Sequence, residues 1–162
     1  QPSLMVLMVQ KEVAERIVGK KNGAKQNFLR FTLPRDAAGS DASQNFALPR
    51  SSKVSESLLS ISVKAYGRPE IIRCVPAGYF SPAPKVDSAV LKISNISKKF
   101  FQDIGENKFF ETARKGFSQK RKMLINNLKA DKEDFTACNI DEKARAEDVS
   151  LEQWKCLTFL MK

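Results

Sequence analysis

The sequence predicts an α/β fold followed by a small helical C-terminal portion. Residues 3–9 are uniformly apolar, as in a strand of a parallel sheet that is covered on both faces. Residues 70–76 and 86–93 also have strand character, and the short connection between them allows only antiparallel pairing. From residue 107 onward apolar side chains recur at helical spacing, so helices should dominate the rest of the chain.

Two helices are predicted among these strands. Residues 11–18 place three apolar side chains on one side, and Gly19 follows at the position where helices commonly end in a left-handed conformation. Helical character returns at about residues 57–66 and stops at Gly67. We therefore expect residues 1–94 to contain a strand, two helices and a closing antiparallel pair.

Residues 95–162 are predicted to be helical throughout. Residues 107–128 gather phenylalanines and leucines near one side, with a break around residues 116–118. The final helix has a strong start signal, because Ser150 and Gln153 have the spacing of a capping box. The apolar residues that follow at helical spacing are expected to face a core.

Residues 20–56 interrupt this pattern. They are rich in Gly, Asn, Ser, Asp, Pro and Lys, a composition typical of loops or disorder. A short repeat of the form F-x-L-P-R occurs within them at residues 31–35 and 46–50. Its phenylalanines could dock on the domain surface while its arginines bind phosphate. The alternative is a coincidence within a flexible insertion.

The chain is strongly basic, with 28 Lys and Arg against 18 Asp and Glu, a formal charge of +10 and a pI near 9.7. The excess lies in residues 92–129, which hold ten bases and three acids, whereas residues 130–162 hold five bases and eight acids. We expect a polyanionic partner, nucleic acid first and an anionic membrane surface second. No run approaches the ~18 apolar residues of a membrane span, so no membrane insertion is predicted.

Cysteine and histidine usage narrows the chemistry. Cys74, Cys138 and Cys156 are widely spaced in apolar contexts and include no C-x-x-C pair, which favours buried thiols in a reducing compartment. A cytoplasmic location is therefore expected. The absence of histidine excludes histidine acid–base catalysis, Ser-His-Asp triads and histidine zinc sites within these 162 residues, and no metal site is predicted.

The segment between the two later strands is the most informative one. Residues 79–91 read Y-F-S-P-A-P-K-V-D-S-A-V-L. The prolines fix their own φ and restrict the residue before them, so the loop is stiff. A stiff loop that presents Phe80 beside Lys85 suits a nucleotide base attached to phosphate. The alternative is a proline-rich bend whose Phe80 fills the core.

Four motifs stand in one order along the chain. They are residues 8–17 (M-V-Q-K-E-V-A-E-R-I), 80–91 (F-S-P-A-P-K-V-D-S-A-V-L), 117–124 (F-S-Q-K-R-K-M-L) and 145–152 (R-A-E-D-V-S-L-E). In this order they resemble four segments of the ribosomal RNA adenine dimethyltransferases of the KsgA type. Those segments are a strand-to-helix segment, the post-catalytic loop, the basic F-x-Q-R-R-K-x-L run and the R-A-E-x-L-S-L-E signature. The resemblance implies that residues 1–94 are the last strands of a Rossmann-like methyltransferase sheet and that the remainder is a small all-helical domain.

The resemblance also implies a reaction. Such enzymes transfer two methyl groups from S-adenosylmethionine to the N6 nitrogen of adenines in small-subunit ribosomal RNA. Phe80 would stack on one face of the flipped-out base. Pro82 and Pro84 would hold the loop, and Lys85 would touch a phosphate or the sheet edge. Asp87 is expected to anchor the loop by accepting backbone hydrogen bonds, because the amine needs no strong base before it attacks.

The resemblance assigns RNA binding to the helical portion. Basic side chains there would contact phosphates and position the RNA without reading its sequence. The predicted contact residues are Arg114, Lys115, Lys120, Arg121 and Lys122. The alternative is a charged helix face that contacts only solvent. The expected partner is small-subunit ribosomal RNA or a 30S-type particle, bound by a monomer.

Two family motifs are absent. The cofactor site of such an enzyme needs a glycine-rich turn, and the target adenine needs an N-L-P-Y-like tetrapeptide. The 7 glycines are scattered and no such tetrapeptide occurs. We therefore interpret the chain as the C-terminal half of a longer enzyme, inactive alone, whose other half binds S-adenosylmethionine. No catalytic or cofactor-binding residue is assigned within it.

Two alternatives stay open at this point. One is a large-subunit rRNA adenine methyltransferase of the macrolide-resistance kind, although those enzymes usually have Asn at the position of Asp87. The other is a non-catalytic RNA-binding or ribosome-assembly module. The sequence V-D-S-A-V at residues 86–90 and the signature at residues 145–152 favour the small-subunit enzyme. The long insertion at residues 20–56 departs from the family pattern, in which this connection is brief.

Overall fold

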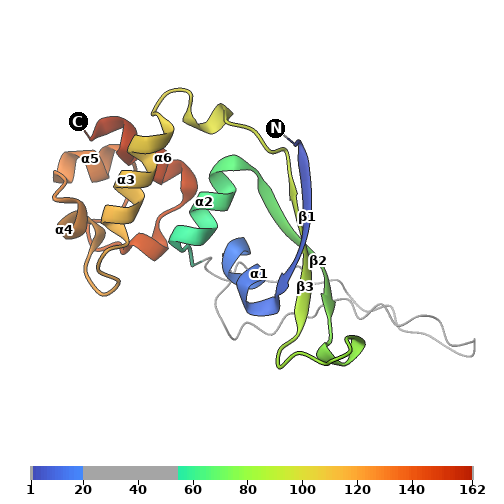
Figure 1. The fold of residues 1–162 in the computed structure, drawn as a ribbon. Coiled ribbons are helices and arrows are strands. Elements are labelled where there is room, and N and C mark those ends of the chain that lie inside the picture. The colour runs from blue at the N-terminus through green and yellow to red at the C-terminus, as the bar shows by residue number, and fades with distance from the viewer. Residues whose placement is uncertain (1, 20–54, 162) are drawn as a thin grey trace, which may run out of the picture.

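The structure is a computed structural model that describes residues 2–19 and 55–161. Three strands form a small sheet with two helices beside it, and the other helices gather in a group on the C-terminal side (Figure 1). The F-x-L-P-R repeat and nearly all of the insertion predicted at residues 20–56 lie outside the described residues.

The sheet has the strand order β1-β3-β2, where β1 is Leu4–Gln10, β2 is Arg68–Val75 and β3 is Ser88–Ser94. Both pairs of neighbours are antiparallel. In the centre of the sheet, Leu91 of β3 lies opposite Leu7 of β1. The antiparallel pairing predicted for the two later strands is therefore confirmed.

The expectation for residues 3–9 is wrong in the described structure. Within the described residues β1 pairs with β3 alone, and it runs antiparallel to β3. Its side chains are not covered, since Leu4 is 51%, Val6 59% and Met8 56% exposed. Alternate residues of a strand share one face of a sheet, so these three form an exposed apolar stripe. Met5 and Leu7 on the other face are each 39% exposed as well, so the elements among the described residues cover neither face of β1 fully.

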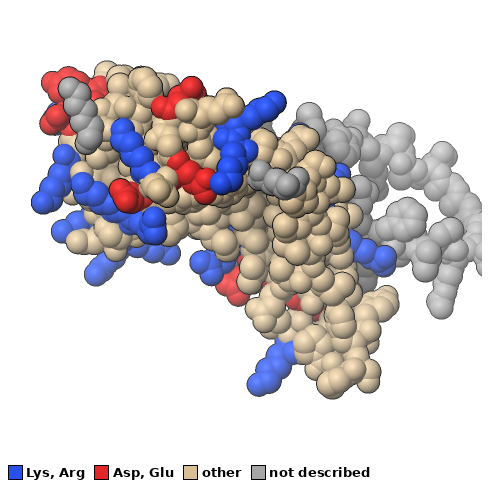
Figure 2. Space-filling view, turned by 45° about the horizontal axis from the view of Figure 1, so that its top comes forward, with Lys and Arg blue, Asp and Glu red and all other residues tan. Residues whose placement is uncertain are grey.

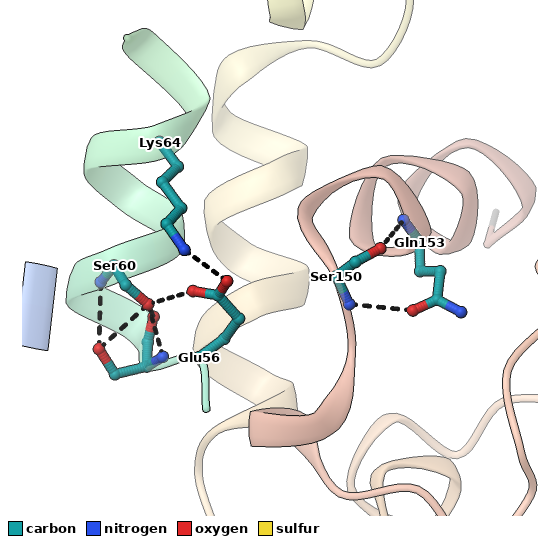
Figure 3. Close-up of polar contacts among 6 residues, drawn as sticks. Glu56, Ser60, Lys64, Ser150 and Gln153 are labelled. Atoms are coloured by element: carbon teal, nitrogen blue, oxygen red, sulfur yellow. Dashed lines mark hydrogen bonds and ion pairs between the residues drawn. The ribbon is translucent and has the colours of Figure 1, made fainter. Parts of the chain in front are cut away.

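Both helices near the sheet begin or end as their sequences predict. α1 (Lys11–Val18) ends at Gly19, whose φ of 83° lies in the left-handed region. α2 (Leu58–Tyr66) begins with a capping box. The Ser57 hydroxyl accepts a hydrogen bond from the Ser60 N–H, and the Ser60 hydroxyl accepts one from the Ser57 N–H (Figure 3).

Glu56 extends this cap and ties it to the C-terminal side. Its carboxylate accepts a hydrogen bond from the Ser60 hydroxyl at 2.6 Å and pairs with Lys64 Nζ at 2.5 Å (Figure 3). Its backbone N–H donates to the carbonyl oxygen of Glu147 at 2.9 Å. The beginning of α2 is therefore bonded to the segment that the R-A-E-x-L-S-L-E signature occupies.

Beyond β3, the regular elements of the described residues are all helical. They are the α-helices α3 (Glu106–Gly116), α4 (Leu124–Leu128), α5 (Lys132–Ala137) and α6 (Leu151–Leu160), and the 3₁₀ turns η2 (Lys99–Phe101) and η3 (Ala146–Asp148). We call residues 95–161 the C-terminal helices. The break predicted around residues 116–118 is confirmed, but it continues to Met123. The capping box of Ser150 and Gln153 is also confirmed at the beginning of α6 (Figure 3).

Two cores stabilise the fold. The smaller core lies between α1 and the sheet and consists of Ala14, Ile17, Ala89, Leu91 and Ile93. The larger core lies among the C-terminal helices, and its largest fully buried side chains are Trp154, Phe109 and Phe135. Ile61 and Ala65 of α2 belong to this larger core, whereas Val63 of α2 packs against the smaller one. α2 therefore joins the two cores, and it lies between the sheet and the C-terminal helices in Figure 1.

The expectation of three buried thiols is wrong for two of the cysteines. Cys138 and Cys156 form a disulfide with their Cα atoms 5.7 Å apart, and Cys74 is a free, partly exposed thiol. The bridge joins the end of α5 to α6, which are brought together by the larger core. Disulfides persist mainly in oxidising environments. The cysteines therefore give no support to a reducing compartment.

Candidate nucleic-acid interface

The connection between β2 and β3, residues 76–87, is an anchored loop, which we call the target-base loop. It opens with the 3₁₀ turn η1 (Ala77–Tyr79). Asp87 Oδ1 accepts a hydrogen bond from the Ala77 N–H at 3.0 Å and so closes the base of the loop. The Asp87 carbonyl oxygen accepts a second bond, from the Lys11 N–H at 3.0 Å. The predicted role of Asp87 as an anchor is therefore confirmed, because both of its contacts are to backbone groups.

The predicted base-contacting residues lie together in this loop. Pro82, Pro84 and Lys85 are exposed, Phe80 is half-buried, and the peptide bond before Pro82 is cis. Phe80 is not among the described residues that pack in or against either core. This placement gives no support to the alternative in which Phe80 fills the core. The neighbouring Tyr79 is 76% exposed, which makes it the more accessible aromatic of the loop.

The predicted phosphate-contacting residues are divided between a helix end and a loop. Arg114 and Lys115 lie on the last turn of α3, where positive charge is favoured by the helix dipole. Lys120, Arg121 and Lys122 lie in the loop between α3 and α4 and not on a helix. All five side chains are exposed. We call these five residues the basic surface.

Asn127 of α4 organises this loop, a role that the sequence analysis did not predict. Its side-chain amide donates to the carbonyl oxygens of Gly116 at 2.7 Å and Gln119 at 3.1 Å. The Gln119 carbonyl oxygen also accepts from the Lys122 N–H at 3.1 Å. One amide group thus closes the end of α3 and fixes the start of the basic loop. One of two adjacent asparagines in a short helix belongs to no pattern that would reveal this role.

The charges of the basic surface are not neutralised within the part of the chain that the structure describes. Other lysines there are paired, for example Lys98 with Glu106 at 2.9 Å and Lys132 with Glu142 at 3.0 Å. None of the five residues of the basic surface has such a partner among the described acidic residues. Lys and Arg side chains gather over the C-terminal helices in Figure 2. Unpaired cations on one surface attract a polyanion.

The described residues contain no glycine-rich turn of the kind that a nucleotide-like cofactor needs. A cavity of about 260 Å³ is lined by residues between 140 and 153, none of which belongs to the sheet. No group of three or more metal-ligating side chains occurs among the described residues. None of the described helices is long and apolar enough to cross a membrane.

Comparison with known proteins decides the family. The sequence model of the family described as ribosomal RNA adenine dimethylase matches residues 43–161, well over half of the chain. The chain belongs to this family. The match includes the target-base loop and the basic surface, and it confirms the resemblance that the four motifs indicated.

The curated relatives carry the name ribosomal RNA small subunit methyltransferase A. The protein of that name from Dehalococcoides mccartyi is 33% identical over 165 residues, which cover 97% of this chain and 46% of the relative. The one from Hydrogenovibrio crunogenus is 39% identical over 110 residues, covering 60% of this chain and 41% of the relative. This dimethylase chain therefore spans about half the length of the curated relatives that it matches.

Solved structures show the fold. The chain is similar to the 23S rRNA methyltransferase ErmE with a TM-score of 0.61 and 14% identity, covering 96% of this chain and 53% of that one. It is similar to a dimethyladenosine transferase from Plasmodium falciparum with a TM-score of 0.60 and 21% identity, covering 96% and 55%. The predicted α/β class is confirmed at this level, with a small antiparallel sheet and helices.

Proposed function

We propose that this chain is the C-terminal half of an S-adenosylmethionine-dependent enzyme that dimethylates adenines of small-subunit ribosomal RNA. The family match carries the proposal, because one matched segment includes both the target-base loop and the basic surface. The names of the curated relatives favour the small subunit. We assign residues 1–94 to the end of a Rossmann-like methyltransferase domain and residues 95–162 to an all-helical RNA-binding domain.

In this proposal the chain positions the substrate. S-adenosylmethionine supplies the methyl group and is held by the other half of the enzyme. Phe80 stacks on the extruded adenine, and Asp87 keeps the loop from moving as the base enters. Holding reactants in line removes much of the entropic part of a barrier. The described residues need supply no base, because the amine attacks in its neutral form.

The basic surface binds the RNA backbone in this proposal. Its five cations are exposed and unpaired with described acids, and Asn127 holds the loop that carries three of them. Contacts to phosphate fix the position and orientation of a nucleic acid without reading its sequence. Selection of the target adenine then depends on which base can reach the target-base loop.

Methyl incorporation into ribosomal particles tests the proposal. The full-length enzyme is incubated with labelled S-adenosylmethionine and with unmethylated 30S or 50S particles. We expect incorporation into adenines of the 30S particle alone. Incorporation into the 50S particle would instead support the macrolide-resistance kind of enzyme. Binding of RNA without any incorporation would support a non-catalytic assembly module.

The 162-residue chain alone should not bind S-adenosylmethionine measurably. The reason is that its described residues provide no glycine-rich turn. Calorimetric titration of the chain with S-adenosylmethionine checks this, with the full-length enzyme as the positive control. Micromolar binding by the chain alone would contradict the proposal that the other half of the enzyme holds S-adenosylmethionine.

Replacing Phe80 separates stacking from packing. In the full-length enzyme Phe80→Leu should keep the fold and slow methyl transfer roughly 5- to 150-fold, because stacking on an aromatic contributes ~1–3 kcal/mol per base. Phe80→Tyr should be much milder, since the ring face survives. Single-turnover rates and thermal melts are measured for both variants.

The control for this pair is Tyr79→Leu, which removes the adjacent, more exposed ring of the same loop. It should leave the rate close to that of the unchanged enzyme. A Phe80→Leu variant with a normal rate and a lowered melting temperature would show that Phe80 is a packing residue. In that case Phe80→Tyr would be the worse substitution, because it would bury an unpaired hydroxyl.

We propose a monomer that acts on the small subunit or a 30S-type particle. A cytoplasmic location is proposed only from the ribosomal substrate. Because Cys138 and Cys156 form a disulfide, the cysteines do not indicate a reducing compartment.

A further inference from the structure

Tyr66 lies where three parts of the chain meet: the sheet, the C-terminal helices, and the segment of residues 95–98 that connects β3 to η2. It is the last residue of α2 and is followed after one glycine by β2. Its hydroxyl donates a hydrogen bond to Glu106 Oε1 at the first turn of α3. The other carboxylate oxygen of Glu106 pairs with Lys98 Nζ at 2.9 Å. We call Tyr66, Lys98 and Glu106 the Tyr66 junction.

The ring and backbone of Tyr66 are fixed as well. Its ring lies 5.0 Å from that of Phe101 and 6.1 Å from that of Phe110, measured between centroids. Its carbonyl oxygen accepts a hydrogen bond from the Ser97 N–H at 2.8 Å. A single residue is thus held by α3 and η2 through its side chain and, through its backbone, by the segment that connects the sheet to them.

On the sheet side of the junction, the backbone is tightly packed at Gly67. A Cβ placed on Gly67 would lie 2.8 Å from the carbonyl oxygen of Ser94, so the beginning of β2 runs directly against the end of β3. Real Cβ atoms essentially never approach backbone this closely. Because Gly67 follows Tyr66, the position of Tyr66 is set by the same strands that carry the target-base loop between them.

The charges of the junction suit a permanent contact at neutral pH. Burial, followed by the hydrogen bond and the charge of Glu106, raises the pKa of Tyr66 to about 12, so the phenol keeps its proton. The hydrogen bonds from Lys98 and Tyr66 lower the pKa of the Glu106 carboxyl. A lowered carboxyl pKa gives a contribution to stability that is present above the ordinary value and is lost as the pH falls through the lowered pKa. Donor and acceptor are therefore both in their bonding forms near pH 7.

We propose that the Tyr66 junction sets the orientation of the basic surface relative to the target-base loop, so that one RNA can contact both. This inference rests on the proposed function. The apolar contacts of Ile61 and Ala65 already bury the interface, but apolar packing is non-directional. The hydrogen bond from the Tyr66 hydroxyl is directional. Tyr66, Lys98 and Glu106 are positioning residues, since none of them needs to touch the RNA.

Two rigidly connected contact sites bind one RNA more tightly than two loosely connected ones, because the second contact forms at high effective concentration. The junction should therefore matter for an RNA that is long enough to reach both sites. It should not matter for a short duplex that contacts the basic surface alone. This difference separates a positioning role from a general effect on stability.

The test uses Tyr66→Phe and Glu106→Gln in the 162-residue chain. Tyr66→Phe removes only the hydroxyl and keeps the ring contacts, and Glu106→Gln removes the charge that Lys98 pairs with. The matched control is Asp103→Asn, which removes an ion pair of similar length, 2.8 Å to Lys155, that joins two parts of the C-terminal helices. Affinities are measured for a small-subunit rRNA fragment that contains the target adenines and for a short RNA duplex.

We expect both junction variants to lose roughly 5- to 20-fold affinity for the rRNA fragment and to bind the short duplex unchanged. The control variant should bind both RNAs as the unchanged chain does. Equal losses for both RNAs with a lower melting temperature would show a merely structural role and overturn the proposal. Unchanged affinity for both RNAs would overturn it as well.

A distance measurement keeps the inference separate from the proposed function. Spin labels are placed on the free Cys74 of β2 and on a cysteine substituted at the exposed Lys108 of α3 (K108C). We expect one narrow distance distribution, which broadens in Tyr66→Phe and Glu106→Gln and stays narrow in Asp103→Asn. If the chain bound neither RNA but these distributions behaved as expected, the proposed function would fail while the junction held. Distributions that were identical in all variants would disprove the junction.

Discussion

Gly116→Ala should lower the free energy of unfolding by about 3 kcal/mol, at the upper end of what overpacking a core costs. Gly116 is the last residue of α3 and is buried. A Cβ at this position would lie 2.4 Å from an atom of the Trp154 ring and 2.8 Å from Leu124 Cδ1. Trp154 is fully buried and stacks on Phe117, with their ring centroids 5.4 Å apart. Because Trp154 is fully buried, its ring cannot move away from the new methyl group without displacing its neighbours in the core.

Thermal melts and urea titrations measure this loss. For a chain of this length, we expect the melting temperature to fall by roughly 6–12 °C. The matched control is Gly78→Ala, because a Cβ on Gly78 meets no atom within 4 Å. It should melt like the unchanged chain. If Gly116→Ala melted with the control, the close packing of α3 against α6 would not exist in solution.

Local sequence signals predicted the hairpin and some of the helix ends correctly. The capping box of Ser150 and Gln153 and the left-handed Gly19 act through bonds to residues at most four positions away. The antiparallel pair followed from the short connection between its strands. These features depend on neighbours in sequence, which is why sequence alone was sufficient for them.

The features that sequence did not predict depend on neighbours in space. Asn127 bonds two carbonyl oxygens eight and eleven residues away, and Tyr66 bonds Glu106 forty residues away. Cys138 and Cys156 pair because α5 and α6 pack together. The exposure of β1 also depends on neighbours in space. An apolar run shows that a strand can be buried, but it does not show which elements lie beside the strand.

The candidate site was predictable in its residues and not in its arrangement. The stiff loop around Phe80 and its anchor Asp87 follow from proline chemistry and a backbone-bonding carboxylate. The basic residues belong to a stretch, residues 107–128, for which apolar spacing predicts helix apart from a short break, whereas Lys120 to Lys122 occupy a loop. The loop begins where Asn127 of α4 closes the end of α3, through bonds to the carbonyl oxygens of Gly116 and Gln119 that no local pattern indicates.

Replacing Lys120, Arg121 and Lys122 together with Ala should weaken RNA binding more than any other change to the exposed surface. Each cation that neutralises a phosphate releases counterions, so three lost contacts should reduce the slope of log affinity against log salt by about 2–3. Acting over the decade of salt between about 0.1 M and 1 M, that change corresponds to roughly a 100-fold loss of affinity at the lower concentration. The fold should survive, because all three side chains are exposed.

The control removes three positive charges elsewhere, at Lys11, Arg16 and Lys132, which lie on α1 and α5 and are all exposed. It changes the net charge of the chain equally, so it separates a local contact from general attraction. Affinity of the 162-residue chain for a small-subunit rRNA fragment is measured across a series of salt concentrations. We expect the control to keep the slope of the unchanged chain within about one contact. Equal slopes for the two triple variants would show that the loop between α3 and α4 is only a solvated surface and that RNA binding lies elsewhere.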